Sequence, residues 1–317
     1  MVKFGFPQGS ARMLTKPKPE SQAGNRPVPL GICLPSGTRD VLHPRSKVER
    51  LAVKNRMTIA LGVICRGGLI IAADTRMSTS DGFCFDACKV KPFLTPSGVF
   101  TIAYASESGN AGETLVNEVT SDLTAKNPDS LNGVEQWLKA AMTRWYSEYR
   151  EEPKTQLIVG TFIDHGTGLY FCQPPNTVTR KTLSDSSNGY VAIGLGASVT
   201  DPLFRTLFGP VLSPHICLRE ISYLMYRAKK ENAFCGGNTD AVFLREEHAE
   251  PLLIKRLDMA QSESFGSRVD YALARTASEV IASTGDDSII LKLASDIYMK
   301  GLGYQQLEFH STTGVKI

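Results

Sequence analysis

From residue 58 onward, the chain alternates short apolar stretches with turns and with longer amphipathic stretches. Residues 58–64 and 69–73 are apolar and joined through Arg66-Gly67-Gly68, which predicts a β-hairpin. The same reasoning predicts further strands at residues 99–105, 156–163, 169–172, 190–194, 240–245 and 252–257. His165 lies in the turn that is expected to join the strands at 156–163 and 169–172.

Helical periodicity occurs between these predicted strands. Apolar residues recur at i+4 in residues 115–123, and they mark one face of residues 134–149, where Trp137 and Trp145 are expected to anchor the core. Shorter helices are predicted at 201–208 and 217–228. Residues 268–282 and 288–299 are helical by the same pattern, and residues 301–317 are expected to be loosely ordered.

The composition is that of a soluble globular protein. Of the 317 residues, 42% are hydrophobic and 21% are charged, and no apolar run approaches the roughly 18 residues of a membrane span. The seven cysteines are scattered without a Cys-x-x-Cys pair. This spacing argues against a disulfide framework or a zinc site and favours a reducing cytoplasm.

Positive charge is concentrated in the first 56 residues, which hold eleven Lys or Arg against three acidic residues. Because the whole chain carries only +3, the remainder is mildly acidic and gives no reason to expect nucleic acid as a partner. The basic stretch is rich in Pro and Gly, lacks sustained periodicity and has no apolar core of the signal-peptide type. We therefore expect a disordered leader.

Three residues near the first predicted hairpin have the types that amide hydrolysis needs. Asp74 directly follows the second strand, Lys89 lies fifteen residues after it, and Thr58 lies sixteen residues before it. A threonine hydroxyl needs an adjacent base, and a free α-amino group on the same residue supplies one, with an unperturbed pKa of about 7.7–8.0. A nearby lysine ammonium lowers that pKa, and an aspartate keeps the lysine charged and in place. This chemistry requires Thr58 to be the first residue.

The segment Ala72-Ala73-Asp74-Thr75-Arg76, with Thr58 and Lys89 at these distances, resembles the start of a proteasome-type β-subunit, a member of the N-terminal-nucleophile hydrolases. The Met57-Thr58 pair and the Asp-to-Lys spacing are similar to those of the bacterial ancestral β-subunit branch. The resemblance covers roughly residues 58–257. It implies a threonine-type peptidase or amide hydrolase with Thr58 as nucleophile, tuned by Asp74 and Lys89. No metal or organic cofactor is implied.

The order of predicted elements agrees with this resemblance. A hairpin, a helix pair, a second hairpin, a second helix pair and closing strands suit two packed sheets with helices on both outer faces. The fold class we expect is α+β, in the form of a four-layer αββα sandwich. By resemblance, we also expect self-association into a ring or a helical stack and a peptide or protein substrate, whereas an ATPase partner stays open.

The resemblance further implies an oxyanion hole formed by the backbone N–H of Gly109, although Ser106 could occupy that place instead. For the lysine, Lys89 matches the family spacing. Two-fold alternation along a strand would point Lys89 and Lys91 the same way, so facing does not separate them.

Supporting groups are expected before the second glycine pair. Family members place an Asp and a Ser there to support the threonine amine, and this chain has Asn232 and Cys235, followed by Gly236. Another supporting serine of the family is replaced by Ala197, whose side chain forms no hydrogen bond.

Residues 1–57 and 258–317 flank the predicted hydrolase domain. Residues 1–57 are a pro-segment cut before Thr58, a permanent tail, or an over-extended gene start, and Met57 directly before a threonine favours the last. Pro-segments of the family generally end in glycine, whereas the residue before Thr58 in this chain is Met57. Residues 258–317 are expected to form a helical extension and a tail. Two alternatives to a peptidase stay open, namely a non-catalytic structural subunit and a hydrolase of a single small amide.

Overall fold

The computed structural model describes residues 58–78, 84–149, 154–185, 188–207, 213–246, 250–282 and 309–311, all within one compact unit, Arg45–Ile317. The leader of residues 1–57 and the helix predicted at 288–299 lie outside the described residues, so both stay predictions. Across the described ranges, no helix is both long and apolar enough to cross a membrane.

The first predicted hairpin is part of a six-stranded antiparallel sheet. Its strands β1 (Ile59–Cys65) and β2 (Gly68–Asp74) pair from Ala60 with Ala73 to Cys65 with Gly68. The turn between them requires glycine, because Gly67 has a φ of 76°. The sheet order is β10-β1-β2-β11-β12-β13, where the other strands are β10 (Tyr190–Gly194), β11 (Thr239–Arg245), β12 (Leu252–Ile254) and β13 (Phe309–Ser311).

A second, five-stranded antiparallel sheet has the order β5-β6-β7-β8-β9. Its strands are β5 (Val90–Thr95), β6 (Gly98–Ser106), β7 (Thr155–Ile163), β8 (Gly166–Gln173) and β9 (Thr177–Lys181). The predicted turn at His165 is confirmed, since it joins β7 to β8 with a φ of 57°. A short separate pair consists of β3 (Arg76–Ser78) and β4 (Cys84–Asp86).

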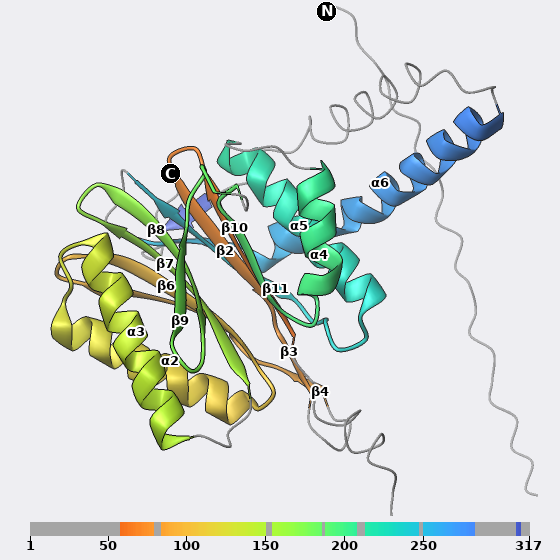
Figure 1. The fold of residues 1–317 in the computed structure, drawn as a ribbon. Helices are drawn as coiled ribbons and strands as arrows, with labels where there is room; N and C mark the ends of the chain where they lie inside the picture. Colours follow the sequence, from red (N-terminus) through yellow and green to blue (C-terminus); the bar gives the residue numbers. More distant parts are fainter. Residues whose placement is uncertain are drawn as a thin grey trace, which may run out of the picture. The chain divides into compact units, whose positions relative to one another are not determined.

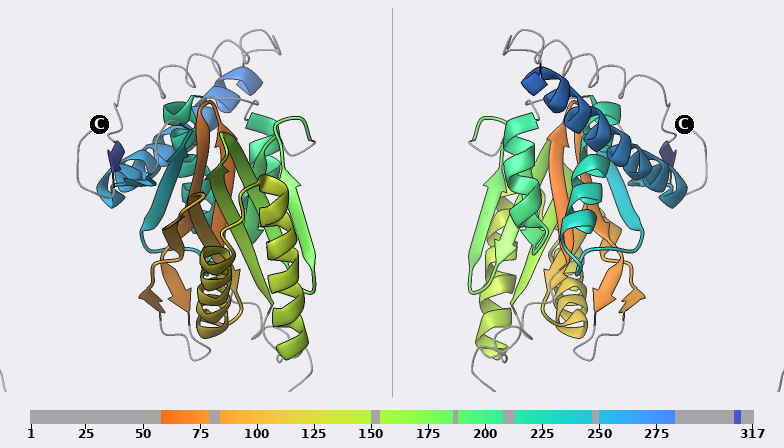
Figure 2. Two further views of the ribbon diagram at one scale, coloured as in Figure 1. Left: turned by 90° about the vertical axis from the view of Figure 1, so that its left-hand side faces the viewer. Right: turned by 90° about the vertical axis from the view of Figure 1, so that its right-hand side faces the viewer.

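Helices pack on one face of each sheet (Figure 1). The five-stranded sheet carries α2 (Gly109–Lys126) and α3 (Leu131–Glu148). On the six-stranded sheet lie α4 (Ala197–Leu207), α5 (Pro214–Glu231) and α6 (Arg256–Ala282). The side views look onto the sheets from the two opposite sides, with α2 and α3 in front in one view and α5 and α6 in front in the other (Figure 2). Mixed helices and antiparallel sheets confirm the α+β class.

Three buried apolar clusters hold these elements together. One lies between the two sheets and includes Leu69, Ala73, Ile158 and Leu169. The others lie between each sheet and its helices. The close approach of the sheets depends on a missing side chain, because a Cβ built at Gly62 would lie 2.7 Å from Leu169 Cδ1.

Two expectations about the elements were wrong. Trp145 is buried as expected, but Trp137 is 38% exposed on the outer side of α3, under the ammonium of Lys126. The strand predicted at 252–257 ends at Ile254, and α6 starts at Arg256. In the tail predicted at 301–317, the structure describes residues 309–311, which form β13 and pair with β12, and the rest of that tail lies outside the described residues.

Candidate active site

Asp74 is the centre of the polar site at the end of β2, where its side chain is 0% exposed. Its Oδ1 accepts the backbone N–H of Ile59 at 3.2 Å and the Nζ of Lys89 at 2.9 Å, and its Oδ2 accepts the N–H of Gly236 at 2.8 Å. A carboxylate that accepts hydrogen bonds from three donors, one of them cationic, is held firmly in one orientation. The Asp74 carboxylate therefore binds three segments of the chain, at Ile59, Lys89 and Gly236.

Lys89 lies just before β5, and its side chain is 1% exposed. Its Nζ donates to Asp74 and also to the backbone carbonyl of Arg76. Burial lowers the pKa of Lys89, while the charge of Asp74 opposes that shift. Lys91, by contrast, is 29% exposed and pairs with Glu113. The expectation that the two lysines point the same way was wrong, because Lys89 precedes the strand and does not share its alternation.

Thr58 lies directly before β1 and is buried. Its carbonyl accepts the N–H of Gly196 at 3.5 Å, and the next residue, Ile59, donates its N–H to Asp74. Among the described residues, the Thr58 hydroxyl has no hydrogen-bond partner. The backbone of Thr58 is thus fixed beside the ion pair, whereas its Oγ1 is left without a bond.

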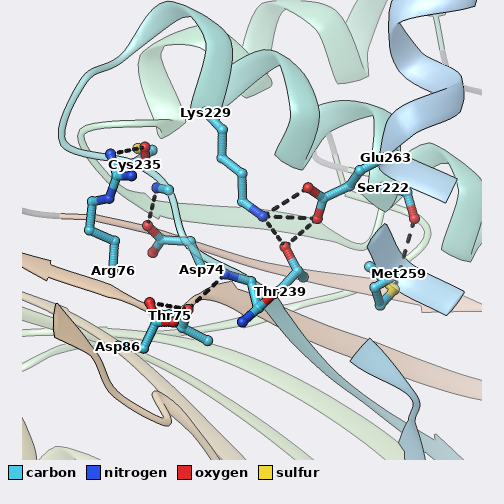
Figure 3. A network of polar contacts seen from close by, with 12 residues as sticks. Asp74, Thr75, Arg76, Asp86, Ser222, Lys229, Cys235, Thr239, Met259 and Glu263 are labelled. Carbon is cyan, nitrogen blue, oxygen red and sulfur yellow. Dashed lines mark hydrogen bonds and ion pairs between the residues drawn. The ribbon is translucent and has the colours of Figure 1, made fainter. Parts of the chain in front are cut away.

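The loop of residues 232–238, between α5 and β11, forms one wall of the site (Figure 3). Besides the Gly236 N–H on Asp74, the carbonyl of Gly236 accepts the N–H of Arg76 at 3.1 Å. The Arg76 guanidinium donates to the carbonyl of Ala233 at 3.2 Å. The backbone of this loop therefore binds Asp74 at the end of β2 and Arg76 at the start of β3. The sequence alone does not specify such contacts.

Two side chains of this loop were expected to support the Thr58 amine. The Asn232 side chain accepts the N–H of Phe234 at 3.0 Å, so it closes the turn at the end of α5. Cys235 is buried, and burial together with the charge of Asp74 raises the pKa of its thiol to about 12. It is therefore an uncharged thiol at neutral pH. The described hydrogen bonds connect neither side chain to Thr58.

The residues considered for the oxyanion hole lie at the start of α2. Gly109 is its first residue, and a Cβ built there would lie 2.2 Å from Met77 Cε. As a first helical residue, Gly109 has a backbone N–H with no acceptor inside the helix. The Ser106 hydroxyl bonds Thr155 Oγ1 at 2.7 Å and accepts the N–H of Ser108. Among the described residues, no hydrogen bond joins Gly109 or Ser106 to Thr58.

Sequence reasoning missed two groups at this site. Gly194, the last residue of β10, and Gly196 bracket Thr58: a Cβ built at Gly194 would lie 2.0 Å from the Thr58 carbonyl oxygen, and Gly196 donates to that oxygen. The closely spaced glycines at the end of a predicted strand were the available signal. Ala197, expected nearby, is the first residue of α4. The second group, Thr75 and its partner Asp86 at 2.9 Å, had no signal.

No metal site accompanies this arrangement in the described part of the chain, where no group of three or more His, Cys, Asp or Glu could hold an ion. No protein-family model and no curated protein matches the sequence. Solved structures do match: an Anbu (Gly-1) mutant from Hyphomicrobium sp. strain MC1 has a TM-score of 0.61 at 18% identity, over 70% of this chain and 99% of that chain. The fold is that of the Anbu proteins.

Two further Anbu structures support this likeness. Anbu, the ancestral beta-subunit, from Yersinia bercovieri has a TM-score of 0.58 at 13% identity, over 68% of this chain and 97% of that chain. The Anbu complex from Pseudomonas aeruginosa, solved as a helical assembly, has a TM-score of 0.56 at 15% identity, over 69% of this chain and 96% of that chain. At these identities the likeness to Anbu concerns the fold. It agrees, at that level, with the resemblance carried by Thr58, Asp74 and Lys89.

Proposed function

We propose that this chain is a proteasome-like, threonine-type peptidase or amide hydrolase. In this proposal Thr58 is the first residue of the mature chain and acts as the nucleophile. The observation that carries the proposal is the buried Lys89–Asp74 pair, since Asp74 also holds the N–H of Ile59, one peptide away from Thr58. The Thr58 hydroxyl is buried beside this pair without a hydrogen-bond partner among the described residues.

The proposed chemistry uses groups of Thr58 and its neighbours. The free α-amine takes the hydroxyl proton as Oγ1 attacks the substrate carbonyl carbon. The resulting ammonium then gives that proton to the leaving amine, and an ester to Thr58 remains. Water, deprotonated by the same amine, hydrolyses the ester and restores the hydroxyl. Because a neighbouring cation disfavours a protonated amine, Lys89 keeps part of the Thr58 amine unprotonated, and therefore basic, near neutral pH.

The oxyanion donor proposed is the Gly109 N–H. Its place as the first residue of α2 supports this, because first-turn N–H groups are free and the helix dipole favours negative charge there. A Cβ built at Gly109 would lie 2.2 Å from Met77 Cε, so the Met77 side chain borders the proposed oxyanion site. Asn232, Cys235 and Gly236 act as supporting residues, of which Gly236 works through Asp74.

At the level of architecture, we infer a four-layer αββα sandwich, a hydrolase domain over residues 58–257 and an extension over 258–317. The expected substrate is a peptide or protein. Self-association into a ring or helical stack is supported by the helical assembly of the Anbu complex from Pseudomonas aeruginosa. A mature chain that begins at Thr58 is part of the proposal, since only then does Thr58 carry a free amine. Such a chain arises by cleavage of a pro-segment or by translation from Met57 and removal of that methionine.

The decisive experiment compares residues 58–317, beginning with Thr58, with the same chain carrying Thr58→Ala. Both are tested on a panel of peptides and small amides and with a threonine-directed electrophile. Turnover and labelling by the first protein alone would support the mechanism, whereas equal turnover by both would refute it. Cleavage of one small amide and no peptide would favour a single-substrate amidohydrolase.

A second candidate function is a non-catalytic subunit of the same fold. Asn232 and Cys235 form no described hydrogen bond to Thr58, and Ala197 has no polar side-chain group, so the amine lacks the side-chain partners expected by resemblance. The same experiment separates the two candidates. Neither turnover nor labelling, in a protein that stays folded, would favour the structural subunit.

A further inference from the structure

The loop of residues 232–238 places Gly236 on Asp74, so the position of this loop depends on how its two ends are fixed. Lys229 lies in the last turn of α5, before the loop, and Thr239 is the first residue of β11, after it. Both ends contact one side chain from a distant helix, Glu263 of α6 (Figure 3). Glu263 lies beyond the segment that resembles the hydrolase family.

The three side chains form a closed, largely buried network. Lys229 Nζ lies 2.8 and 3.0 Å from the two carboxylate oxygens of Glu263 and 2.7 Å from Thr239 Oγ1. The Thr239 hydroxyl in turn donates to Glu263. Lys229 and Glu263 are each 14% exposed, and Thr239 is buried. Charge-assisted bonds with little access to water are strong and geometrically specific.

This network lies next to the ion pair of the candidate site. Thr239 on β11 stands opposite Asp74 on β2 in the strand register, and the Gly236 N–H donates to Asp74 Oδ2 at 2.8 Å. Two connections therefore join the network to the ion pair: the cross-strand pair of Thr239 with Asp74, and the loop that carries Gly236. Lys229 and Thr239 thus flank the loop that supplies this donor, one on each side.

We propose that Glu263 is a positioning residue: by holding Lys229 and Thr239, it keeps the Gly236 N–H on Asp74 and thereby orients the Asp74–Lys89 pair. The inference deepens the proposed function and rests on it for the catalytic meaning of that pair. It gives helix α6 a role at the site, in addition to its packing against α5 and β11.

A second polar contact between α5 and α6 supplies a matched control. Asp270, farther along α6, accepts the Tyr223 hydroxyl at 3.0 Å, and it pairs with Arg227 and Lys230. These bonds fasten the same two helices. Only the pair with Lys230, whose side chain is 53% exposed, lies near an end of the loop, and none of these bonds involves Thr239. A merely structural role for α6 would make Glu263 and Asp270 equivalent, whereas a positioning role would separate them.

The first test measures amide hydrogen exchange in the full chain carrying Glu263→Gln, Glu263→Ala or Asp270→Asn. The exchange rate of Gly236 is divided by that of Val242, in the middle of β11, to remove effects on global stability. We expect this ratio to rise about tenfold in Glu263→Ala, less in the isosteric Glu263→Gln, and not at all in Asp270→Asn. An unchanged ratio in the Glu263→Gln protein, or the same rise in Asp270→Asn, would overturn the proposal.

The second test follows the titration of Lys89 by NMR of ¹³C-labelled lysine, assigned with Lys89→Arg. The charged or titratable groups that face Lys89 are Asp74, Asp86 and Cys235. Without the Gly236 donor, the negative charge of Asp74 is less compensated and attracts the Lys89 ammonium more strongly, and a looser loop admits water. Both effects raise the pKa of Lys89. An upward shift in Glu263→Gln and none in Asp270→Asn is expected.

Neither measurement needs turnover, so the two proposals fail separately. If exchange and titration change as expected but no Thr58-dependent hydrolysis exists, the positioning role stands and the proposed function falls. If hydrolysis exists, Glu263→Gln should lower kcat with little change in KM, because it alters the catalytic pair rather than substrate binding. Loss of substrate binding alone, with an unchanged Lys89 titration, would count against the inference.

Discussion

At the scale of single residues, the candidate site depends on two ionised groups that have almost no contact with water. Taking such charges out of water costs several kcal/mol for each, and their attraction offsets this only when other hydrogen bonds complete the geometry. Asp74 has those bonds, from Ile59 and Gly236. A buried ion pair is weak evidence for stability. A chemical role therefore accounts better for Lys89 and Asp74 than packing does.

Removing one member of this pair should be worse than removing both. Lys89→Met leaves the Asp74 carboxylate buried without its cation and is expected to lower the free energy of unfolding by about 3–5 kcal/mol. The double variant Lys89→Met/Asp74→Asn should recover part of that loss, since no uncompensated charge remains. Urea unfolding of the single and double variants measures the coupling. As a control, Lys91→Met should change stability by less than about 0.5 kcal/mol, and an equally small effect of Lys89→Met would contradict the pair's importance.

Tyr104 predicts a pH dependence of a specific sign. Burial, with a smaller contribution from Glu113, raises the pKa of Tyr104 to about 12. In the unfolded chain a phenol ionises near about pH 10, so the stability linked to Tyr104 is fully present below that pH and is lost as pH rises toward the folded pKa.

The variant Tyr104→Phe has no phenol to ionise and isolates this effect. Above about pH 10, the stability difference should move in favour of the variant by at most about 1.4 kcal/mol per pH unit. Denaturant unfolding of both proteins between about pH 8 and pH 11 measures this difference. A difference that stays constant over the whole range would show that the buried phenol is not the titrating group.

At the scale of elements, the strands with buried, β-branched residues were predictable and the short polar ones were not. The hairpin β1–β2 and strands β6, β7 and β10 follow the apolar pattern within about one residue of their predicted ends. Strand β4 has only three residues and is exposed at every position, so no alternation of buried and exposed positions marks it in the sequence. The start of α6 depends on Arg256, whose guanidinium binds Asp240 on β11, and no local pattern contains such a contact.

Packing between the two sheets should be intolerant of a single added methyl group. In Gly62→Ala the new Cβ would lie 2.7 Å from Leu169 Cδ1 and 3.0 Å from Ile158 Cγ2, both in the core. Overpacking of this kind typically costs about 1–3 kcal/mol. Thermal unfolding is the measurement, and Gly133→Ala in the first turn of α3 is the control. Its Cβ would meet only Ser130 Oγ at 3.2 Å and Pro128 Cβ at 3.4 Å, so a comparable loss there would point to a general effect of replacing glycine.

At the scale of the whole molecule, the site consists of parts that were predictable to different degrees. Asp74 and Lys89 are fifteen residues apart, so their spacing could be read from the sequence. Gly236 lies 162 residues from Asp74, and its glycine pair was noted only by resemblance. Gly196 and Glu263 were not predicted, because their roles arise from contacts between elements that meet only in the folded chain.

The last prediction concerns the requirement for a free amine at Thr58. A threonine-directed electrophile should label the chain that begins at Thr58 and should not label the full chain of residues 1–317, in which Thr58 N is part of a peptide bond. The labelling rate should rise with pH as the amine loses its proton. Its unperturbed pKa is about 7.7–8.0, and the Lys89 charge should place the inflection below that range. Intact mass spectrometry over a pH series measures the rate.

Lys89→Met tests the cause of that inflection. Without the neighbouring cation, the protonated amine is no longer disfavoured, so the inflection should move to higher pH and the labelling rate near neutral pH should fall. The exposed lysine provides the comparison: Lys91→Met should leave the inflection unchanged, because Lys91 pairs with Glu113 at the surface. Equal labelling of the full chain would show that the amine is not the base. The same shift in both lysine variants would trace the effect to net charge rather than to the buried pair.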